Sequence, residues 1–228
     1  MSLFITPTDL LPLIGTPAAP RLIDVRLPED AAADPMLIPG AVRATHTDLE
    51  AAQRLAGPDT VILCQRGAKL SQGVAAALRS RGIPVRALAG GTEAWAALPG
   101  APRLAISKVP DGPICVRLGT IDGLAAAWAI RRFAAPCAEI WDVEAPGEVA
   151  ARFGGTAIEH GAIAEIGALG LNVPALDTLA RALEAGTPSL ADLWAGLYDT
   201  SAQAMDRGCA LMDAALIWAR SRDAGGAA

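Results

Sequence analysis

The chain has 228 residues, of which 52% are hydrophobic and 19% are charged, and this composition excludes an intrinsically disordered protein. The net charge of −5 argues against a nucleic-acid partner, because proteins that bind nucleic acids usually carry a basic surplus. No apolar run of about 18 residues is present, so the sequence predicts no membrane span. The first residues lack the basic and apolar regions of a signal peptide, and we therefore expect a cytoplasmic protein.

The first half of the chain alternates between strand and helix patterns. The segment Thr60–Cys64 (TVILC) is almost continuously apolar, as expected for a central parallel strand that is buried on both faces. Strands separated by helices indicate an α/β domain with a parallel sheet covered on both faces. The patterns predict helices over Thr8–Ile14, Thr47–Leu55 and Leu70–Arg81, a helix that starts within Pro28–Ala33, and further strands over Arg21–Arg26 and Val85–Leu88.

The best candidate for a domain boundary is the segment 99–113, which carries four prolines and two glycines. We therefore predict a first domain over residues 1–100, a linker over 101–113 and a second domain over 114–222. The second domain is expected to be mainly helical α+β. Its predicted elements are strands over Ile114–Leu118 and Glu139–Val143, a helix over Ile121–Phe133 and mostly helix over 174–222.

The cysteines and histidines give no metal-ligand pattern. The four cysteines lie far apart, no CxxC pair is present, and there are only two histidines. We therefore expect no metal and no cofactor. In a cytosolic chain of this size the cysteines need no disulfides, and most are read as small buried hydrophobic residues.

Cys64 departs from this reading because of the residues that follow it. It stands at the carboxyl end of the predicted buried strand, where α/β sheets bind ligands, and a loop leads from it into a helix. Backbone N–H groups at such a loop bind anions and stabilise a thiolate, and Arg66 and Lys69 add two cations. No histidine is near in sequence, so the loop itself would activate the cysteine. The alternative reading is a buried cysteine that ends a core strand, with Arg66 and Lys69 simply solvated.

The motifs around Cys64 resemble the rhodanese family. The series Cys64-x-x-Gly67-x-Lys69, followed by Ser71, is similar to the family's active-site loop. Three further motifs are similar to family segments and occur in the family's order over about residues 4–100. These are Leu22-Ile23-Asp24-Val25-Arg26, Ile38-Pro39-Gly40-Ala41 (after Leu37, where the family usually has His) and Leu88-Ala89-Gly90-Gly91 with Trp95.

The resemblance implies a sulfurtransferase with Cys64 as its catalytic residue. Its partners would be a small sulfur-containing anion such as thiosulfate, and a thiol or other nucleophile that collects the sulfur from a Cys64 persulfide. Arg26 would line the site and Asp24 would organise nearby loops, with the polar end of a strand as the alternative reading for both. The substrate-binding residues implied are Gln65, Arg66, Gly67, Ala68, Lys69, Arg26 and Asp24.

Two other functions stay open at this point. Phosphatases of a related fold use a longer loop that ends in Arg, whereas Lys69 fits the shorter register. The other alternative is a non-catalytic sensor or binding module for oxyanion stress, which would use the Cys64 loop as a recognition pocket.

A second candidate site lies in the second half of the chain. Two adjacent arginines, Arg131 and Arg132, inside an apolar helix indicate an anion or partner site, or an arginine paired with an acid such as Asp122 or Glu139. The segments around Asp122–Phe133, Ile158-Glu159-His160 and Met205–Arg220 resemble the C-terminal domain of the chromate-resistance protein family. The candidate site residues are Asp122, Arg131, Arg132, Glu159 and His160.

This second resemblance is incomplete. The family's Cys-Pro is Ala126-Ala127 here, its Arg after the Asp is Gly123, and residues 161–167 contain no cysteine. The thiol or metal chemistry of that family is therefore not expected. Ala-rich exposed helices could pair two copies of the chain as a homodimer.

Overall fold

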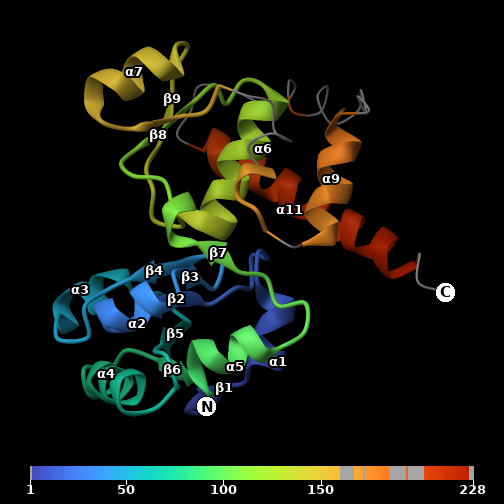
Figure 1. Cartoon of the computed structure of the whole chain (residues 1–228). Helices are drawn as coiled ribbons and strands as arrows, with labels where there is room; N and C mark the ends of the chain where they lie inside the picture. The colour runs from blue at the N-terminus through green and yellow to red at the C-terminus, as the bar shows by residue number, and fades with distance from the viewer. Residues whose placement is uncertain (1, 160–166, 172, 185–193, 195–202, 226–228) are drawn as a thin grey trace. The chain divides into compact units, whose positions relative to one another are not determined.

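The computed structural model in Figure 1 describes residues 2–159, 167–171, 173–184, 194 and 203–225. The chain forms two compact units. The first comprises Met1–Ser107 with Arg132–Pro136, and the second comprises Lys108–Arg131 with Cys137–Ala228.

The first unit is built on a five-stranded parallel sheet with the strand order β1-β6-β5-β2-β4. The central strand β5 has all four of its residues buried, which confirms the parallel strand predicted there. It ends at Leu63, one residue before Cys64. The strands β1 and β4 are too short to show a periodic pattern in the sequence. The strands are β1 (Phe4–Ile5), β2 (Arg21–Asp24), β4 (Ala41–Arg43), β5 (Thr60–Leu63) and β6 (Val85–Leu88).

A helix follows each of these five strands in the sequence, and local chemistry sets the helix ends. Asp48 accepts a hydrogen bond from the Ala51 N–H at 2.8 Å, so helix α3 begins at Leu49 rather than at Thr47 as predicted. The first predicted helix is interrupted, because α1 passes into a 3-10 turn, Leu11–Leu13, that contains Pro12. The helices are α1 (Pro7–Leu10), α2 (Pro28–Ala33), α3 (Leu49–Leu55), α4 (Lys69–Ser80) and α5 (Gly91–Ala97).

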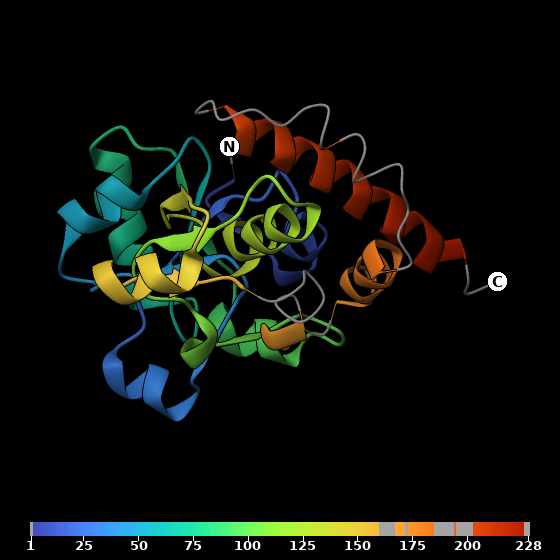
Figure 2. The ribbon, with the colours of Figure 1, turned by 90° about the horizontal axis from the view of Figure 1, so that it is seen from above.

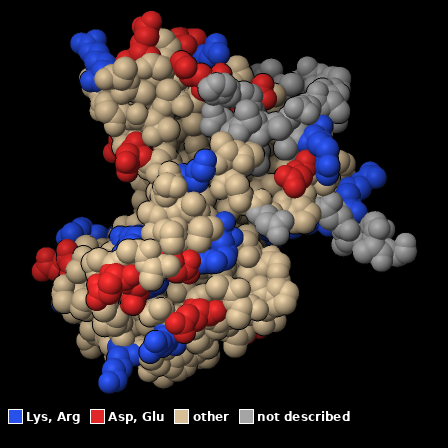
Figure 3. Space-filling model, viewed as in Figure 1, with Lys and Arg blue, Asp and Glu red and all other residues tan. Residues whose placement is uncertain are grey.

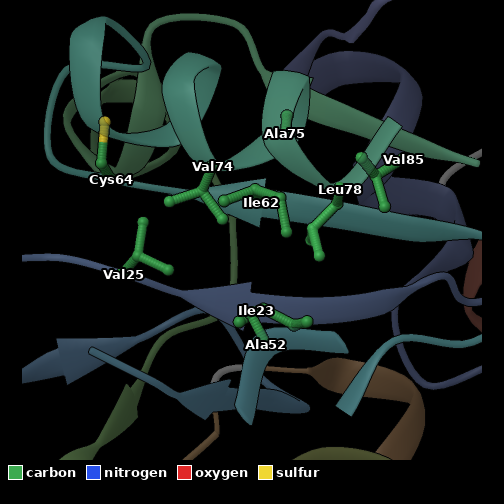
Figure 4. Close-up of a cluster of buried hydrophobic side chains, with 9 residues drawn as sticks. All are labelled: Ile23, Val25, Ala52, Ile62, Cys64, Val74, Ala75, Leu78 and Val85. Carbon is green, nitrogen blue, oxygen red and sulfur yellow. The ribbon is translucent and has the colours of Figure 1, made fainter. Parts of the chain in front are cut away.

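The core on one face of this sheet is made of small and branched side chains. Residues of β2 and β5 meet residues of α3 and α4, so these two helices cover the same face (Figure 4). Burial of this apolar surface is the main force that holds the helices on the sheet. The cluster comprises Ile23, Val25, Ala52, Ile62, Cys64, Val74, Ala75, Leu78 and Val85.

The segment after α5 packs on the first unit. Strand β7 (Leu104–Ala105) pairs antiparallel with β3 (Met36–Leu37), and Leu104 is fully buried. The Trp95 indole N–H donates to the Pro102 carbonyl at 2.9 Å. The predicted linker over 101–113 therefore contains residues that belong to the first unit's core.

The second unit contains a three-stranded parallel sheet with the order β10-β8-β9. Helix α6 contributes seven consecutive buried residues, Gly123–Ala129, and a π-helical turn, Ile130–Ala134, follows it where one continuous α-helix was predicted. The helix α9 packs against α11 (Figures 1 and 2). The other elements are β8 (Ile114–Val116), α6 (Ile121–Ala129), β9 (Ile140–Asp142), α7 (Pro146–Phe153), β10 (Thr156–Ala157), α9 (Pro174–Glu184) and α11 (Ala204–Gly225).

Buried polar contacts tie α6 and α11 together. The indole N–H of Trp128 donates to the Asp213 carboxylate at 2.8 Å, and both side chains are buried. Outside these two helices, the Trp194 indole N–H donates to the Leu118 carbonyl at 2.6 Å, just before α6. Within the described residues, no helix has the length and hydropathy needed to cross a membrane.

Candidate active site

Cys64 lies at the carboxyl edge of the parallel sheet, directly after β5. The register pairs Leu63 of β5 with Asp24 of β2, and Asp24 with Arg43 of β4, so these strand ends lie side by side. Ligands of open α/β sheets bind at this edge. The position of Cys64 therefore suits a ligand-binding or catalytic side chain.

The Cys64 sulfur is buried, with only 4% of the residue exposed, and it has a polar neighbour. Its Sγ lies 3.1 Å from the Oγ of Ser71, a fully buried residue in the first turn of α4. In Figure 4 the sulfur points away from Val25. A hydroxyl at this distance can donate to a thiolate, a contact that was not predicted from the sequence.

Hydrogen bonds from the first turn of helix α5 hold the loop after Cys64 in place. The N–H groups of Thr92 and Glu93 donate to the carbonyls of Cys64 and Gln65, each at 3.0 Å. These bonds turn the carbonyls toward α5 and so fix the orientation of the loop peptides. The Cys64 loop and the segment that begins at Gly90, which are separate motifs in the sequence, are thus hydrogen-bonded to each other in the fold.

Gly67 lets the loop approach α5 closely. Its φ is +63°, and a Cβ placed there would lie 2.6 Å from the backbone nitrogens of both Gly90 and Gly91. A side chain at Gly67 would therefore collide with backbone as well as strain the φ angle. Glycine is therefore the residue that this position of the loop requires.

The backbone N–H groups of residues 65–69 donate no hydrogen bond to any residue that the structure describes. Four of these residues, from Gln65 to Ala68, precede α4, and Lys69 is its first residue. Consecutive unpaired N–H groups at a helix N-terminus form an anion-binding concavity. The loop beside Cys64 can therefore hold an anion by its backbone alone.

The two predicted cations of the loop are both on the surface. The Arg66 Nε lies 3.6 Å from the Glu93 carboxylate, but the side chains are 75% and 53% exposed, so this pair is weak. The Lys69 side chain is exposed, and no described residue forms an ion pair with it. Both cations are available to a ligand that enters from solvent.

Arg26 and Asp24 form a buried pair inside the domain. The Arg26 Nη2 lies 2.8 Å from the Asp24 carboxylate, and each side chain is 1% exposed. The Arg26 guanidinium also donates to the carbonyls of Asp34 and Met36, at 3.0 and 2.7 Å. Its donors are thus committed to the chain between α2 and β3. Asp24 thus holds Arg26, and Arg26 holds the segment between α2 and β3. A role of Arg26 in lining the Cys64 site stays a prediction.

The residues of the second predicted site are not gathered at one point among those described. Asp122 stands in the first turn of α6, whereas Arg131 follows the far end of that helix and lies 3.9 Å from Asp206 of α11. Glu159 accepts a hydrogen bond from the Gly147 N–H at 3.1 Å. Arg132 falls in the first unit's segment, and His160 lies outside the described residues.

The other cysteines differ from Cys64 in their surroundings. Cys115, in the middle of β8, is fully buried, and this burial raises the pKa of its thiol. Cys137 is exposed and Cys209 is partly exposed. Among the described residues, no group of three or more His, Cys, Asp or Glu is placed to hold a metal ion.

The family comparison agrees with the geometry of the first unit. Residues 6–98 match the family described as "Rhodanese-like domain". This segment is a rhodanese-like domain. The match ends at residue 98, so the likeness of the second half to the chromate-resistance family stays a prediction.

Several solved structures are similar to the same part of the chain. A rhodanese-like domain protein from Staphylococcus aureus is 24% identical, with a TM-score of 0.37 over 41% of this chain and 91% of that chain. A thiosulfate sulfurtransferase from Pseudomonas aeruginosa is 30% identical, with a TM-score of 0.36 over 42% of this chain and 18% of that chain. For Bacillus anthracis CoADR-RHD the identity is 22% and the TM-score 0.35, over 40% of this chain and 16% of that chain. The chain therefore spans less than a fifth of the last two proteins. No curated protein matches the chain.

Proposed function

We propose that the protein is a sulfurtransferase that carries sulfur as a persulfide on Cys64. The observation that carries the proposal is the run of unpaired N–H groups at residues 65–69, beside a cysteine at the carboxyl end of a central strand. An anion-binding loop next to a nucleophilic sulfur suits a donor that is itself an anion.

In the first step, the Cys64 thiolate attacks the outer sulfur of thiosulfate. A new S–S bond forms at Cys64, and the S–S bond of thiosulfate breaks. Sulfite leaves as a dianion with the electron pair of that bond, and the Cys64 persulfide keeps one negative charge. The loop N–H groups, with Arg66 and Lys69, would stabilise the charge on the departing sulfite.

In the second step, an acceptor thiolate attacks the outer sulfur of the persulfide. The acceptor gains the sulfur as a new persulfide, and Cys64 leaves as a thiolate, ready for another cycle. The Ser71 hydroxyl lies 3.1 Å from the Cys64 sulfur. It can therefore donate to the Cys64 thiolate both before the first step and after the second.

The direct test is steady-state turnover of thiosulfate with cyanide as the acceptor. The quantities measured are the thiocyanate and sulfite that form. We expect turnover in the natural chain and none with Cys64→Ser, because a hydroxyl does not form the persulfide. Cys137→Ser is the matched control, since Cys137 is exposed and lies in a different part of the chain.

Two results would contradict the proposal. Equal turnover with Cys64→Ser would show that the sulfur passes elsewhere. No turnover with thiosulfate or other sulfane donors, together with binding of these anions at the loop, would favour the non-catalytic binding module instead.

A further inference from the structure

A hollow of about 210 Å³ opens at the carboxyl end of β4, on residues outside the Cys64 loop. This volume equals roughly seven water molecules. Its walls come from the last residue of β4 and from the segments that follow β2 and β4. They are Arg26, Pro28, Arg43, Ala44, Thr45 and His46.

The hollow is lined by basic side chains, and two of them, Arg43 and His46, have no acidic partner among the described residues. Arg26 is neutralised by its buried pair with Asp24. Arg43 donates one hydrogen bond, to the Arg26 carbonyl at 3.3 Å, and it has no acidic partner among the described residues. The His46 imidazole has no hydrogen-bond partner there either. No acidic side chain lines the hollow.

The hollow stands at the same sheet edge as Cys64. The register places the ends of β5, β2 and β4 side by side, through Leu63, Asp24 and Arg43. Neighbouring strands are about 4.8 Å apart, so the ends of β5 and β4 are separated by about 10 Å. This separation is about the length of an extended tripeptide.

We propose that the Arg43–His46 hollow binds a carboxylate of the thiol that accepts sulfur from Cys64. An arginine that has donors to spare and a histidine beside it are suited to a carboxylate, whereas a neutral acceptor would leave both without a partner. The occupant is thus a small peptide-like thiol acid. The inference rests on the proposed function, because the acceptor is defined by the sulfur that Cys64 would give up.

The test compares glutathione with its dimethyl ester as acceptors from thiosulfate-loaded enzyme. His46→Asn and Arg43→Gln should each raise the KM for glutathione about three- to tenfold, because each removes one charged or hydrogen-bonding contact. The KM for the ester should stay unchanged, and so should the rate of sulfite release from thiosulfate. Arg54→Gln is the matched control, because Arg54 lies outside this hollow.

Equal changes for glutathione and its ester, or no change for glutathione, would overturn the proposal. His46→Asn guards against a folding defect, since the imidazole makes no hydrogen bond with the described residues.

Direct binding separates the two proposals. S-Methylglutathione cannot accept sulfur, so its Kd, measured by calorimetry, does not depend on catalysis. We expect His46→Asn to weaken this binding by a similar factor. Unchanged binding would refute the hollow as a carboxylate site even if sulfur transfer is confirmed, whereas absent persulfide with weakened binding would refute only the proposed function.

Discussion

The close contact between Gly67 and α5 makes this glycine the most sensitive residue of the loop. We expect Gly67→Ala to lower the free energy of unfolding by about 2–5 kcal/mol, from positive-φ strain together with overlap. Urea denaturation measures this loss. Gly82→Ala is the control, because Gly82 also has a positive φ, +80°, but a Cβ there meets nothing within 4 Å. A loss at Gly67 no larger than at Gly82 would contradict the close contact.

The buried pair of Asp24 and Arg26 predicts an asymmetric response to mutation. Arg26→Met leaves the Asp24 carboxylate buried without its cation, so we expect a loss of about 3–5 kcal/mol in urea denaturation. The double variant Asp24→Asn with Arg26→Met should be less destabilised than Arg26→Met alone, because the stranded charge is gone. If the single variant unfolds like the natural chain, Arg26 does not hold this region together.

At the residue scale, the sequence was most informative about Cys64 and Gly67. Both belong to one short segment of the chain. What a cysteine after a strand and a glycine in a tight loop can do is therefore evident from their immediate neighbours in the sequence. The commitment of Arg26 to the Asp34 and Met36 carbonyls and the contact of Ser71 with the Cys64 sulfur could not be predicted in this way. They depend on where other segments lie after folding.

Helix α3 gives a test at the scale of one element. The Asp48 carboxylate accepts from the Ala51 N–H, so Asp48→Ala should cost about 1 kcal/mol of unfolding free energy, and Asp48→Asn much less. Thermal or urea unfolding checks both. Equal losses for Ala and Asn would show that the cap contributes little.

Strand β8 gives a pH prediction. Burial raises the pKa of the Cys115 thiol in the folded chain, while the unfolded chain has an ordinary thiol pKa of about 8.5. The stabilisation from a protonated buried thiol is therefore complete below that pH and is lost as the pH rises above it. Between about pH 8 and pH 10, the unfolding free energy of Cys115→Ala should fall less steeply than that of the natural chain. Parallel slopes would contradict this.

The longer elements were predictable and the short ones were not. The apolar run of β5 and the twelve residues of α4 carry clear patterns. Strands β1 and β4 have two and three residues, too few for an alternating pattern, and they form because the rest of the sheet is there to pair with. The π-helical turn after α6 is likewise absent from any local signal in the sequence.

At the scale of the whole molecule, the charge predicts its behaviour toward nucleic acids. The net charge is −5, and acidic and basic side chains are interspersed on the face shown in Figure 3. We expect no retardation of double-stranded DNA in a gel at about 0.15 M salt, because no net positive surface displaces counterions. Retardation that weakens steeply with added salt would contradict this expectation.

The two halves of the chain differ in how much of their function can be predicted from the sequence. Residues 6–98 have a family match, and the loop chemistry can be derived from that part alone. The second half has patterns of strand and helix, but Arg131 lies near Asp206 of α11 whereas Glu159 contacts Gly147 of α7, so no single site could be built from them.

The proposed function depends on the acceptance of a sulfur atom by Cys64 from an anionic donor. Mass spectrometry of the intact chain after incubation with thiosulfate, followed by mapping of the modified peptide, tests it most directly. We expect a gain of one sulfur atom on the peptide that contains Cys64, absent in Cys64→Ser and retained in Cys137→Ser. No gain at Cys64, under conditions in which a small alkylating reagent does modify it, would contradict sulfur transfer through this cysteine.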